Sequence, residues 1–294
     1  GDHRDLHSFP TRRSSDLQYS FFYDEPFGDF SGFPLIFLSR ETKKDVTVVL
    51  GGDGGDEVFG GYAWHKAGSR LDLIYRLPRI IRKLIQKIPF KHQALDQLKR
   101  ACAASFYGKS DFFAQTTNLF NSPLYAEITK KHLGQALSKG NNSFAEAFRI
   151  YDVQFNTLQD LFCVKVDRAS MGYALEVRAP FLDQRVVEFA QRIPTKWKQT
   201  SKKTKILMRE IIKEFLPKEI VYRKKSGFHP PIDTWILNDA YANELGEAIN
   251  CLQRLCPSII EYYNSLLKHA SKPYIQTFSI KMLIFYNWWK KWVK

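Results

Sequence analysis

Hydrophobic residues recur at helical spacing through most of this chain. From Leu71 onward, apolar side chains return at positions i, i+3, i+4 and i+7, with Arg and Lys on the opposite face. Pro78 interrupts this pattern and predicts the start of a second helix. Further helices are expected over residues 145–171 and 275–292. Three later prolines are expected to mark boundaries between the helices in this part of the chain: Pro180, Pro194 and Pro217.

One short segment follows a different pattern. Residues 45–50 (DVTVVL) are apolar and β-branched, with charges before them and glycines after them, which is typical of a buried parallel strand. A loop follows over residues 51–55, and a helix is expected from about Asp56, although Gly60 and Gly61 weaken it. Because a single strand cannot make a sheet, we expect its partner strands upstream of this sequence. The pattern predicts one strand–loop–helix unit followed by a mostly helical remainder.

The composition is that of a globular protein. Of 294 residues, 44% are hydrophobic and 25% are charged, which excludes a disordered chain and allows one or two domains. The 44 Lys and Arg exceed the 30 Asp and Glu, and the net charge of +14 favours an anionic partner. Charges interrupt every apolar stretch before it reaches about 18 residues, so no membrane-spanning helix is expected. The cysteines form no CxxC pair, which favours a reducing compartment, and we expect the cytoplasm.

Residues 1–17 show no hydrophobic periodicity and no apolar core of a secretory signal. The run from Ser8 to Leu17 resembles an in-frame translation of a common sequencing adapter. We therefore expect residues 1–17 to be a disordered assembly artefact, and a single domain to occupy residues 18–294 with its amino end missing. A natural polar tail is the alternative, and sequencing of the locus distinguishes the two.

The segment that carries most chemistry is LGGDGGDEVFGGY at residues 50–62. Its glycines allow a sharp turn and a close approach to a ligand. Ligands of parallel α/β sheets bind at the carboxyl ends of strands, and helix N-termini suit phosphate oxygens. Asp53, Asp56 and Glu57 would repel a phosphate unless a cation lay between them, and Mg²⁺ takes one or two carboxylates together with substrate phosphates. The loop predicts a Mg²⁺–nucleotide site, although a glycine–aspartate turn with a capping acid fits equally well.

This loop resembles the S-G-D-G-G-D-E-L-F-G-G-Y signature of the carboxyl-terminal synthetase domain of the asparagine synthetase family. Three other stretches resemble that family in the same order: YDEPFGD at residues 23–29, KVDRASM with LEVRAPFLD within 165–183, and RKKSGF with two prolines and a tryptophan within 223–235. Any one block by itself is weak evidence for the resemblance, but four blocks in the family's order are specific for it. The resemblance implies an α/β fold of the adenine-nucleotide α-hydrolase type, Rossmann-like, and mostly helical in this chain.

The resemblance implies an ATP-dependent carbon–nitrogen ligase. In this family ATP adenylates the side-chain carboxylate of aspartate and releases pyrophosphate, and ammonia then attacks the acyl-adenylate to give asparagine and AMP. A separate amino-terminal glutaminase domain supplies the ammonia from glutamine. The implied cofactors are ATP and Mg²⁺, and the implied partners are aspartate, ammonia and the missing glutaminase domain. A homodimer stays open, whereas membrane and nucleic-acid partners are not expected.

The resemblance also implies roles for single residues. Asp53 matches an acidic position near the acyl-adenylate, where it is placed to take a proton from the attacking amine. Lys225 matches the lysine expected to stabilise negative charge on the reacting carbonyl and on pyrophosphate. Asp56 matches the position that holds Mg²⁺ on the triphosphate. The cofactor-binding loop is expected to comprise Gly52, Gly54, Gly55, Asp56 and Glu57.

Several charged residues of the third block have two interpretations. They either form ion pairs that orient the pocket or belong to a purely structural network of salt bridges. Asp183, after PFL, either caps a helix or supports the pocket wall. The members of the supporting set are Asp167, Arg168, Glu176 and Arg178.

The sequence departs from the family pattern in two ways. Gly51 stands where the family has Ser, and the S-G-G-x-D-S pyrophosphate loop of the family is absent from this sequence. We therefore expect this polypeptide by itself not to synthesise asparagine. We also expect exposed apolar surface, and hence poor solubility, where upstream strands would pair.

Three alternatives remain beside asparagine synthesis. The first is an amidotransferase that acts on another carboxylate, such as a sugar acid of a surface polysaccharide. The second is a non-catalytic basic module that binds nucleic acid, and the third is a scaffold that keeps the fold without the chemistry. Three tryptophans near the carboxyl end have lysine neighbours and fit base stacking, but a packed terminal helix is favoured: Trp288, Trp289 and Trp292.

Overall fold

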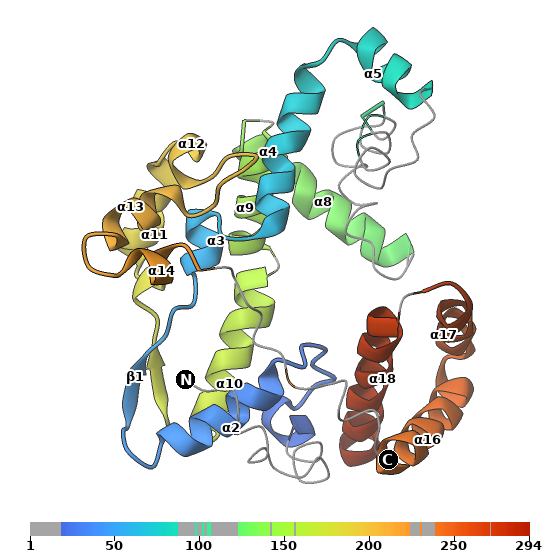
Figure 1. The fold of residues 1–294 in the computed structure, drawn as a ribbon. Helices are drawn as coiled ribbons and strands as arrows, with labels where there is room; N and C mark the ends of the chain where they lie inside the picture. The colour runs from blue at the N-terminus through green and yellow to red at the C-terminus, as the bar shows by residue number, and fades with distance from the viewer. Residues whose placement is uncertain are drawn as a thin grey trace. The chain divides into compact units, whose positions relative to one another are not determined.

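The computed structural model describes residues 19–87, 98, 102, 105–106, 123–141, 143–155, 157–223, 230, 239–270 and 272–294. Two compact units divide the chain (Figure 1). Unit 1 combines Gly1–Val49, Val164–Arg178 and Lys225–Lys294, and unit 2 combines Leu50–Cys163 and Ala179–Lys224. The fold is rich in helices and carries one small sheet in its described part.

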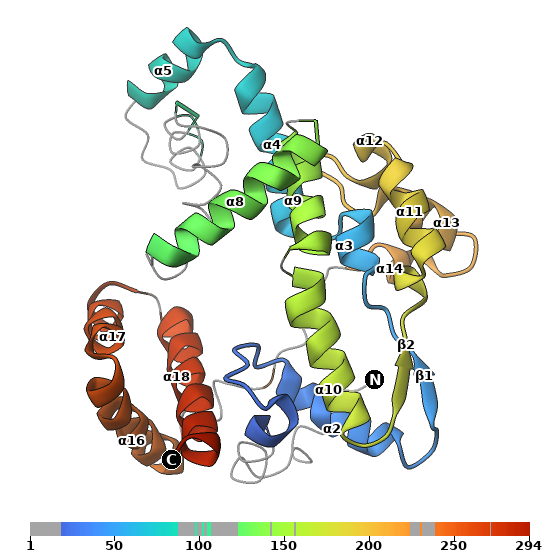
Figure 2. The ribbon, with the colours of Figure 1, turned by 180° about the vertical axis from the view of Figure 1, so that it is seen from behind.

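That sheet lies in unit 1 except for Leu50, the last residue of its first strand. Strands β1 (Val48–Leu50) and β2 (Glu176–Arg178) lie side by side and run in the same direction (Figure 2). The backbone N–H of Glu176 donates to the carbonyl of Thr47 at 3.0 Å. Helix α10 (Val164–Met171) packs against helix α2 (Gly32–Thr42). The predicted strand at 45–50 is therefore confirmed in a shorter form, whereas its partner β2 was not predicted.

The prediction that this strand is buried is wrong. Val48 is 41% exposed and Leu50 is 75% exposed. A sheet of two strands has too little width to bury both of its faces, so apolar side chains that suit a wide parallel sheet stay in contact with water. The expected exposed apolar surface is thus present on β1.

Aromatic side chains form the core of unit 1 around α2. Tyr19 stacks on Phe33 at a centroid distance of 4.0 Å, and Tyr23 stacks on Phe27 at 4.4 Å. All four rings are at most 8% exposed. Burying large rings in offset contact gives this short segment more apolar area per residue than aliphatic side chains would.

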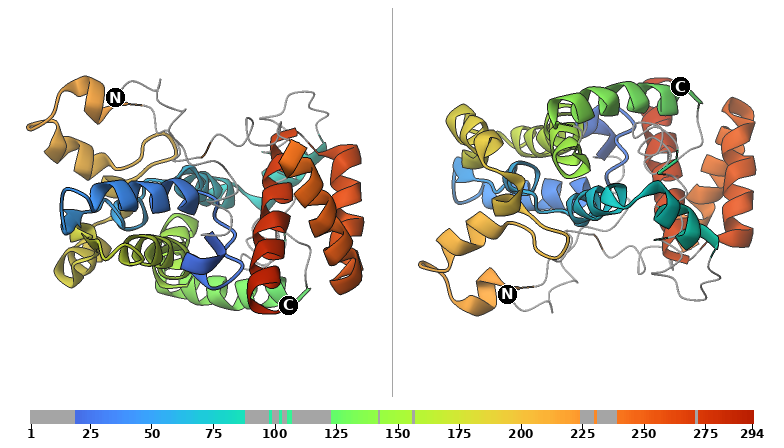
Figure 3. Two further views of the ribbon diagram at one scale, coloured as in Figure 1. Left: turned by 90° about the horizontal axis from the view of Figure 1, so that it is seen from below. Right: turned by 90° about the horizontal axis from the view of Figure 1, so that it is seen from above.

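Three helices complete the described part of unit 1: α16 (Asp239–Leu255), α17 (Pro257–His269) and α18 (Lys272–Trp292), which pack side by side (Figure 3). The predicted terminal helix at 275–292 is confirmed. The indole N–H groups of Trp288 and Trp292 donate to the carbonyls of Asp24 at 3.0 Å and Ser20 at 2.9 Å, although Trp292 is 49% exposed, so the expected packing is only partly present. These bonds tie α18 to the aromatic segment of the same unit.

Within its described residues unit 2 is helical, and apolar clusters lie around α4 and α9 and around α3. The prolines separate its helices as predicted, since α5 follows Pro78 and since Pro194 and Pro217 precede α12 and α14. Its elements are α3 (Gly55–Phe59), α4 (Ala63–Arg76), α5 (Arg79–Lys87), α8 (Pro123–Lys139), α9 (Phe144–Gln154), the π-helix η2 (Thr157–Cys163), the 3-10 helix η3 (Pro180–Leu182), α11 (Gln184–Arg192), α12 (Thr195–Lys198), α13 (Ile206–Ile212) and α14 (Lys218–Val221).

The predicted helix at 145–171 is divided. Helix α9 ends at Gln154, because Phe155 leaves the helical backbone with φ −132°, and η2 and α10 follow. A wider i→i+5 turn places successive side chains differently from an α-helix, so the apolar repeat alone does not reveal it. None of the helices in the described residues is long and apolar enough to span a bilayer.

Candidate functional site

The loop between β1 and α3 is fixed by one glycine with a left-handed backbone. Gly54 has φ +87° and precedes α3, and a Cβ there would lie 2.2 Å from Cδ2 of Leu182. A Cβ on Gly55 would lie 3.3 Å from the Phe181 ring, whereas one on Gly52 would meet nothing within 4 Å. Only Gly54 of these three is therefore required by both backbone conformation and packing.

A second glycine ends α3 after its five residues. Gly60 has φ +72°, and the N–H of Gly61 donates to the carbonyl of Asp56 at 2.7 Å. A Cβ on Gly60 would lie 2.3 Å from Oε1 of Gln199. The helix expected from about Asp56 therefore stops at the glycines that weakened the expectation, and the chain starts α4 with a new orientation.

Asp56, the predicted Mg²⁺ ligand, lies in the first turn of α3. Its Oδ1 is 2.8 Å from Nζ of Lys205, and the Asp56 side chain is 22% exposed. A half-buried carboxylate with oxygen donors near a glycine turn has the ligand type that Mg²⁺ prefers. The lysine partner balances the carboxylate charge in this structure.

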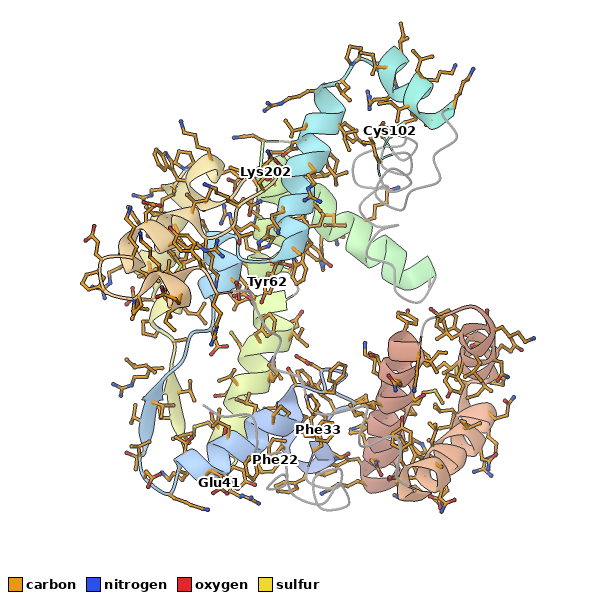
Figure 4. The ribbon with its side chains drawn as sticks, viewed as in Figure 1. Phe22, Phe33, Glu41, Tyr62, Cys102 and Lys202 are labelled. Carbon is orange, nitrogen blue, oxygen red and sulfur yellow. The ribbon has the colours of Figure 1, made fainter. Side chains whose placement is uncertain are left out.

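Asp53 precedes Asp56 in the chain and Glu57 follows it, and the two carboxylates differ in burial. Asp53 is half-buried in the turn before Gly54. Glu57 is 2% exposed, and its Oε1 accepts a hydrogen bond from the Tyr62 hydroxyl, a residue at the start of α4 (Figure 4). Burial raises the pKa of Glu57 even though the Tyr62 hydrogen bond opposes that shift. The Glu57 carboxylate is thus directed at Tyr62 rather than at solvent.

A buried histidine supports the exit of the loop. His65 is 0% exposed, and its Nε2 lies 2.7 Å from Oδ2 of Asp152 on α9. The Tyr62 N–H donates to Nδ1 of His65 at 3.4 Å, so Nδ1 is an acceptor and the proton belongs on Nε2. Trp64 donates its indole N–H to the same Asp152 oxygen at 2.7 Å and stacks on Tyr62. Asp152 therefore receives two donors from the start of α4.

The sequence pattern did not predict this network. The signal was present in the spacing of Tyr62 and His65, since three residues separate a helix N-cap from the side chain that bonds back to it. Its partner Asp152 lies 87 residues further on, and no local pattern connects the two.

In unit 1 a buried ion pair joins two of the sequence blocks. Lys165 is 9% exposed, and its Nζ lies 2.9 Å from Oδ2 of Asp29 and 2.9 Å from Oγ of Ser31. Burial raises the pKa of Asp29, but the Lys165 charge and the Ser31 hydrogen bonds outweigh burial and place that pKa below its usual value. The Tyr23 hydroxyl donates to the Lys165 carbonyl at 3.1 Å. Sequence reasoning did not single out this pair.

The predicted supporting residues occupy separate positions in unit 1. The Arg168 guanidinium donates to the carbonyl of Tyr23 and lies 3.5 Å from Oδ2 of Asp24. Glu176 and Arg178 pair with each other on β2 at 2.8 Å, and both are exposed. Asp167 is exposed on α10. The ion pairs formed by Arg168, Glu176 and Arg178 are present, but their role in a pocket stays a prediction.

Of the two remaining predicted residues, the structure describes Asp183 but not Lys225. Asp183 caps α11, because its Oδ1 accepts from the Arg185 N–H at 2.9 Å. Lys225 lies outside the described residues. Because the loop acids belong to unit 2 and the supporting residues to unit 1, a single pocket formed by both stays a prediction.

A cluster able to enclose a metal by itself is not present among the described side chains, where no group of three or more His, Cys, Asp or Glu is suitably placed. Mg²⁺ sites of nucleotide-binding proteins use only one or two carboxylates, with phosphates and water as the other ligands. Asp56, the predicted ligand, supplies one such carboxylate from the loop.

Comparison with known proteins identifies the class. The family model for asparagine synthase matches residues 16–254. The chain belongs to the asparagine synthase family. Its glycine-rich loop, its Asp29–Lys165 pair and the strand β2 all lie inside the matched region.

Curated relatives carry related names. Over 161 residues, 52% of this chain and 31% of the relative, it is 47% identical to putative asparagine synthetase [glutamine-hydrolyzing] 2 of Methanocaldococcus jannaschii. Over 231 residues, 74% of this chain and 36% of the relative, it is 29% identical to asparagine synthetase [glutamine-hydrolyzing] 1 of Bacillus subtilis. The chain thus spans about a third of the length of these relatives. No solved structure matches it.

Proposed function

We propose that residues 18–294 are part of an ATP-dependent synthetase domain that forms asparagine from aspartate. The side-chain carboxylate of aspartate would be adenylated by ATP with release of pyrophosphate, and ammonia would then displace AMP. The family match over residues 16–254 is the observation that carries this proposal. The small parallel sheet and the glycine loop after β1 fit a Rossmann-like nucleotide fold.

The loop residues divide into ligands and supports. Asp56 is the proposed ligand for Mg²⁺, which when bound would neutralise charge on the triphosphate oxygens. Gly52 leaves open space beside the backbone near Asp56, where the cofactor would bind. Gly55 lets the backbone pack closely against the Phe181 ring. Glu57 acts by holding Tyr62 rather than by reaching the nucleotide, because its side chain is 2% exposed.

Two residues are proposed for the chemistry itself. Asp53, half-buried in the turn before Gly54, is the candidate to take a proton from the attacking amine. Lys225 is the candidate to stabilise negative charge on the carbonyl and on pyrophosphate. Both roles rest on the resemblance of their sequence blocks to the family pattern.

The remaining proposals concern the whole protein. The printed names of the relatives are those of glutamine-hydrolysing enzymes, which supports ammonia supply from glutamine by a separate glutaminase domain. A reducing cytoplasm remains the proposed location. An amidotransferase for another carboxylate is the second candidate, because no described contact specifies aspartate.

The decisive experiment measures pyrophosphate release by the longest polypeptide that the locus encodes. We expect release that requires ATP, Mg²⁺, ammonia and aspartate, and we expect the Asp56→Asn variant to lower the rate by about 100-fold or more. The matched control is Asp45→Asn, which removes an exposed carboxylate near the same strand. Release with a sugar acid but not with aspartate supports the second candidate, and release with neither contradicts both.

A further inference from the structure

A pocket of about 490 Å³ lies within unit 2, away from the glycine loop. It is formed by the end of α8, the first turns of α9 and the connection from α11 to α12, and none of its lining residues belongs to the loop at 51–62. Pockets of 300–1,000 Å³ are typical of small-molecule sites, so this volume suits an organic metabolite.

The charged groups of its described lining are mainly cations. Lys139 comes from α8, Arg149 from α9 and Arg192 from α11, whereas Glu146 is the one carboxylate among the described lining residues. This gives the lining an excess of positive charge. Such a concave surface raises the local concentration of anions.

The carboxylate of Glu146 is already engaged by cations and a hydroxyl. Its Oε2 accepts from Nη2 of Arg149 at 2.5 Å and from Nε at 3.1 Å. Its Oε1 accepts from the Thr195 hydroxyl and lies 3.6 Å from Nζ of the buried Lys198. Because its charge is balanced on both oxygens, Glu146 does not oppose the entry of an anion.

Arg149 has donors left over for a ligand. The residue is 4% exposed, and both of its bonds to Glu146 reach the same oxygen. A guanidinium carries five N–H groups in a fixed plane, and within the described part of the chain Nη1 of Arg149 donates to no acceptor. Nη1 is not one of the fully enclosed side-chain atoms that lack a partner, so solvent reaches it, and a ligand oxygen in the pocket that Arg149 lines would replace water as its acceptor.

We propose that this pocket binds a small organic anion whose carboxylate or phosphate group accepts hydrogen bonds from Nη1 of Arg149. Lys139 and Arg192 flank the anionic group from α8 and α11. Gln154, whose amide oxygen accepts from Nζ of Lys139 at 2.6 Å, orients that lysine at the pocket. The site is additional to the nucleotide loop and does not depend on its chemistry.

The test is isothermal titration of the full 294-residue chain, without nucleotide and at constant ionic strength. Citrate is the carboxylate probe and inorganic phosphate is the phosphate probe. We expect at least one of them to bind with a Kd of about 1 mM or lower. The Lys139→Gln/Arg192→Gln double variant should weaken that binding by about tenfold.

Two further variants make the result specific. The double variant Lys131→Gln/Lys196→Gln removes the same charge from exposed positions outside the pocket, and it should change affinity by less than about twofold. Arg149→Lys keeps the charge but loses the planar donor fork, and it should weaken binding as strongly as the first double variant. Circular dichroism of each variant confirms that it is folded.

The binding of the two probes distinguishes a carboxylate ligand from a phosphate ligand. Binding of citrate alone assigns a carboxylate ligand, and binding of phosphate alone assigns a phosphate ligand. Absence of binding by both probes overturns the proposal. Equal weakening by the two double variants also overturns it, because it would reflect the net charge of the chain rather than the pocket. Since nucleotide is absent, these results are independent of the proposed ligase activity.

Discussion

At the scale of single residues, neighbouring acids of the glycine loop differ in their roles. Asp56 is half-buried and pairs with Lys205, whereas Glu57 is buried and accepts a hydrogen bond from Tyr62. The sequence presents the two as equivalent carboxylates. Because consecutive side chains of a helix point in different directions, the Asp56 carboxylate can reach a ligand while the Glu57 carboxylate supports the start of α4.

Replacing Tyr62 tests the role of Glu57 as a support. Tyr62→Phe leaves a buried carboxyl group without its hydroxyl donor, so we expect the free energy of unfolding to fall by about 1–3 kcal/mol. Urea unfolding followed by circular dichroism measures this change. Tyr173→Phe is the control, because it also removes a tyrosine hydroxyl but at a ring that contacts Phe22 in unit 1, away from Glu57. An equal loss in both variants would mean that the Tyr62 hydroxyl contributes nothing specific.

Lys198 predicts a dependence of stability on pH. Burial, with the nearby Arg149 charge, lowers the pKa of Lys198 from its ordinary 10.5 to about 8. Between these two pKa values the unfolded chain holds a proton that the folded chain does not, so stability from this group rises with pH. Below about pH 8 both states are protonated and the full penalty for the buried charge applies.

The measurement compares the wild-type chain with Lys198→Met, which removes the titrating group. We expect the unfolding free energy of the wild type, relative to the variant, to rise by roughly 2 kcal/mol between pH 8 and pH 10. Other lysines and tyrosines titrate in both proteins and cancel in the difference. A difference that is flat or falls over this range would contradict the prediction.

At the scale of elements, the short helix α3 depends on glycines that begin and end it. Gly54 and Gly60 both have positive φ, and five helical residues between them are too few to be stable alone. Helix α9 is supported differently: Asp72 accepts from the N–H of Phe144 at 2.7 Å and of Ala145 at 3.1 Å. Tertiary partners therefore fix both helices beside the loop.

A pair of glycine variants tests how the loop is held. Gly54→Ala places a Cβ 2.2 Å from Leu182 at φ +87°, so we expect a loss of about 1–3 kcal/mol in the free energy of unfolding. Gly52→Ala is the matched control, because its Cβ would meet nothing within 4 Å, and it should change stability by less than about 0.5 kcal/mol. Similar losses in both variants would show that the turn does not constrain Gly54.

Much of the secondary structure could be predicted from sequence. The strand at 48–50, the helix after Pro78 and the terminal helix α18 follow from local apolar spacing and prolines. The break at Phe155 and the strand β2 could not be predicted. A single stretch of π-helix leaves no apolar repeat of its own that identifies it in the sequence, and a three-residue strand such as β2 depends on the backbone partners that β1 offers.

At the scale of the whole molecule, segments far apart in the chain combine within each unit. In unit 1 the block at 23–29 meets the block within 165–183 through Asp29 and Lys165, which are 136 residues apart. In unit 2 His65 meets Asp152 in the same way. Of these two pairs, the Lys165–Asp29 pair joins two of the family blocks, whereas His65 and Asp152 lie outside all four.

The Lys165–Asp29 pair predicts both a stability change and its pH dependence. Removing the lysine with Lys165→Gln leaves the half-buried Asp29 carboxylate without its cation, and we expect a loss of about 1–3 kcal/mol at neutral pH. Because the folded pKa of Asp29 lies below its ordinary value, this contribution is present above that ordinary pKa and is lost as pH falls through the folded one. The wild type and the variant should therefore converge in strongly acid solution.

An exposed ion pair serves as the control for this prediction. Lys44→Gln removes a lysine that is 65% exposed and contacts Glu41, and surface pairs contribute about 0–1 kcal/mol. Unfolding in urea at neutral and acid pH measures both variants. A loss in Lys165→Gln no larger than that in Lys44→Gln would contradict the importance of the buried pair.

The sequence by itself determined the helical elements, the strand before the glycine loop and the identity of the charged groups in that loop, because periodicity, prolines and glycines act over a few residues. It also carried the four blocks that resemble the asparagine synthetase family. Only the tertiary structure decided that Glu57 is a support, that Lys165 pairs with Asp29, and that Lys139, Arg149 and Arg192 line one pocket. Those contacts join residues from different elements, and their burial and pairing depend on packing that no local pattern encodes.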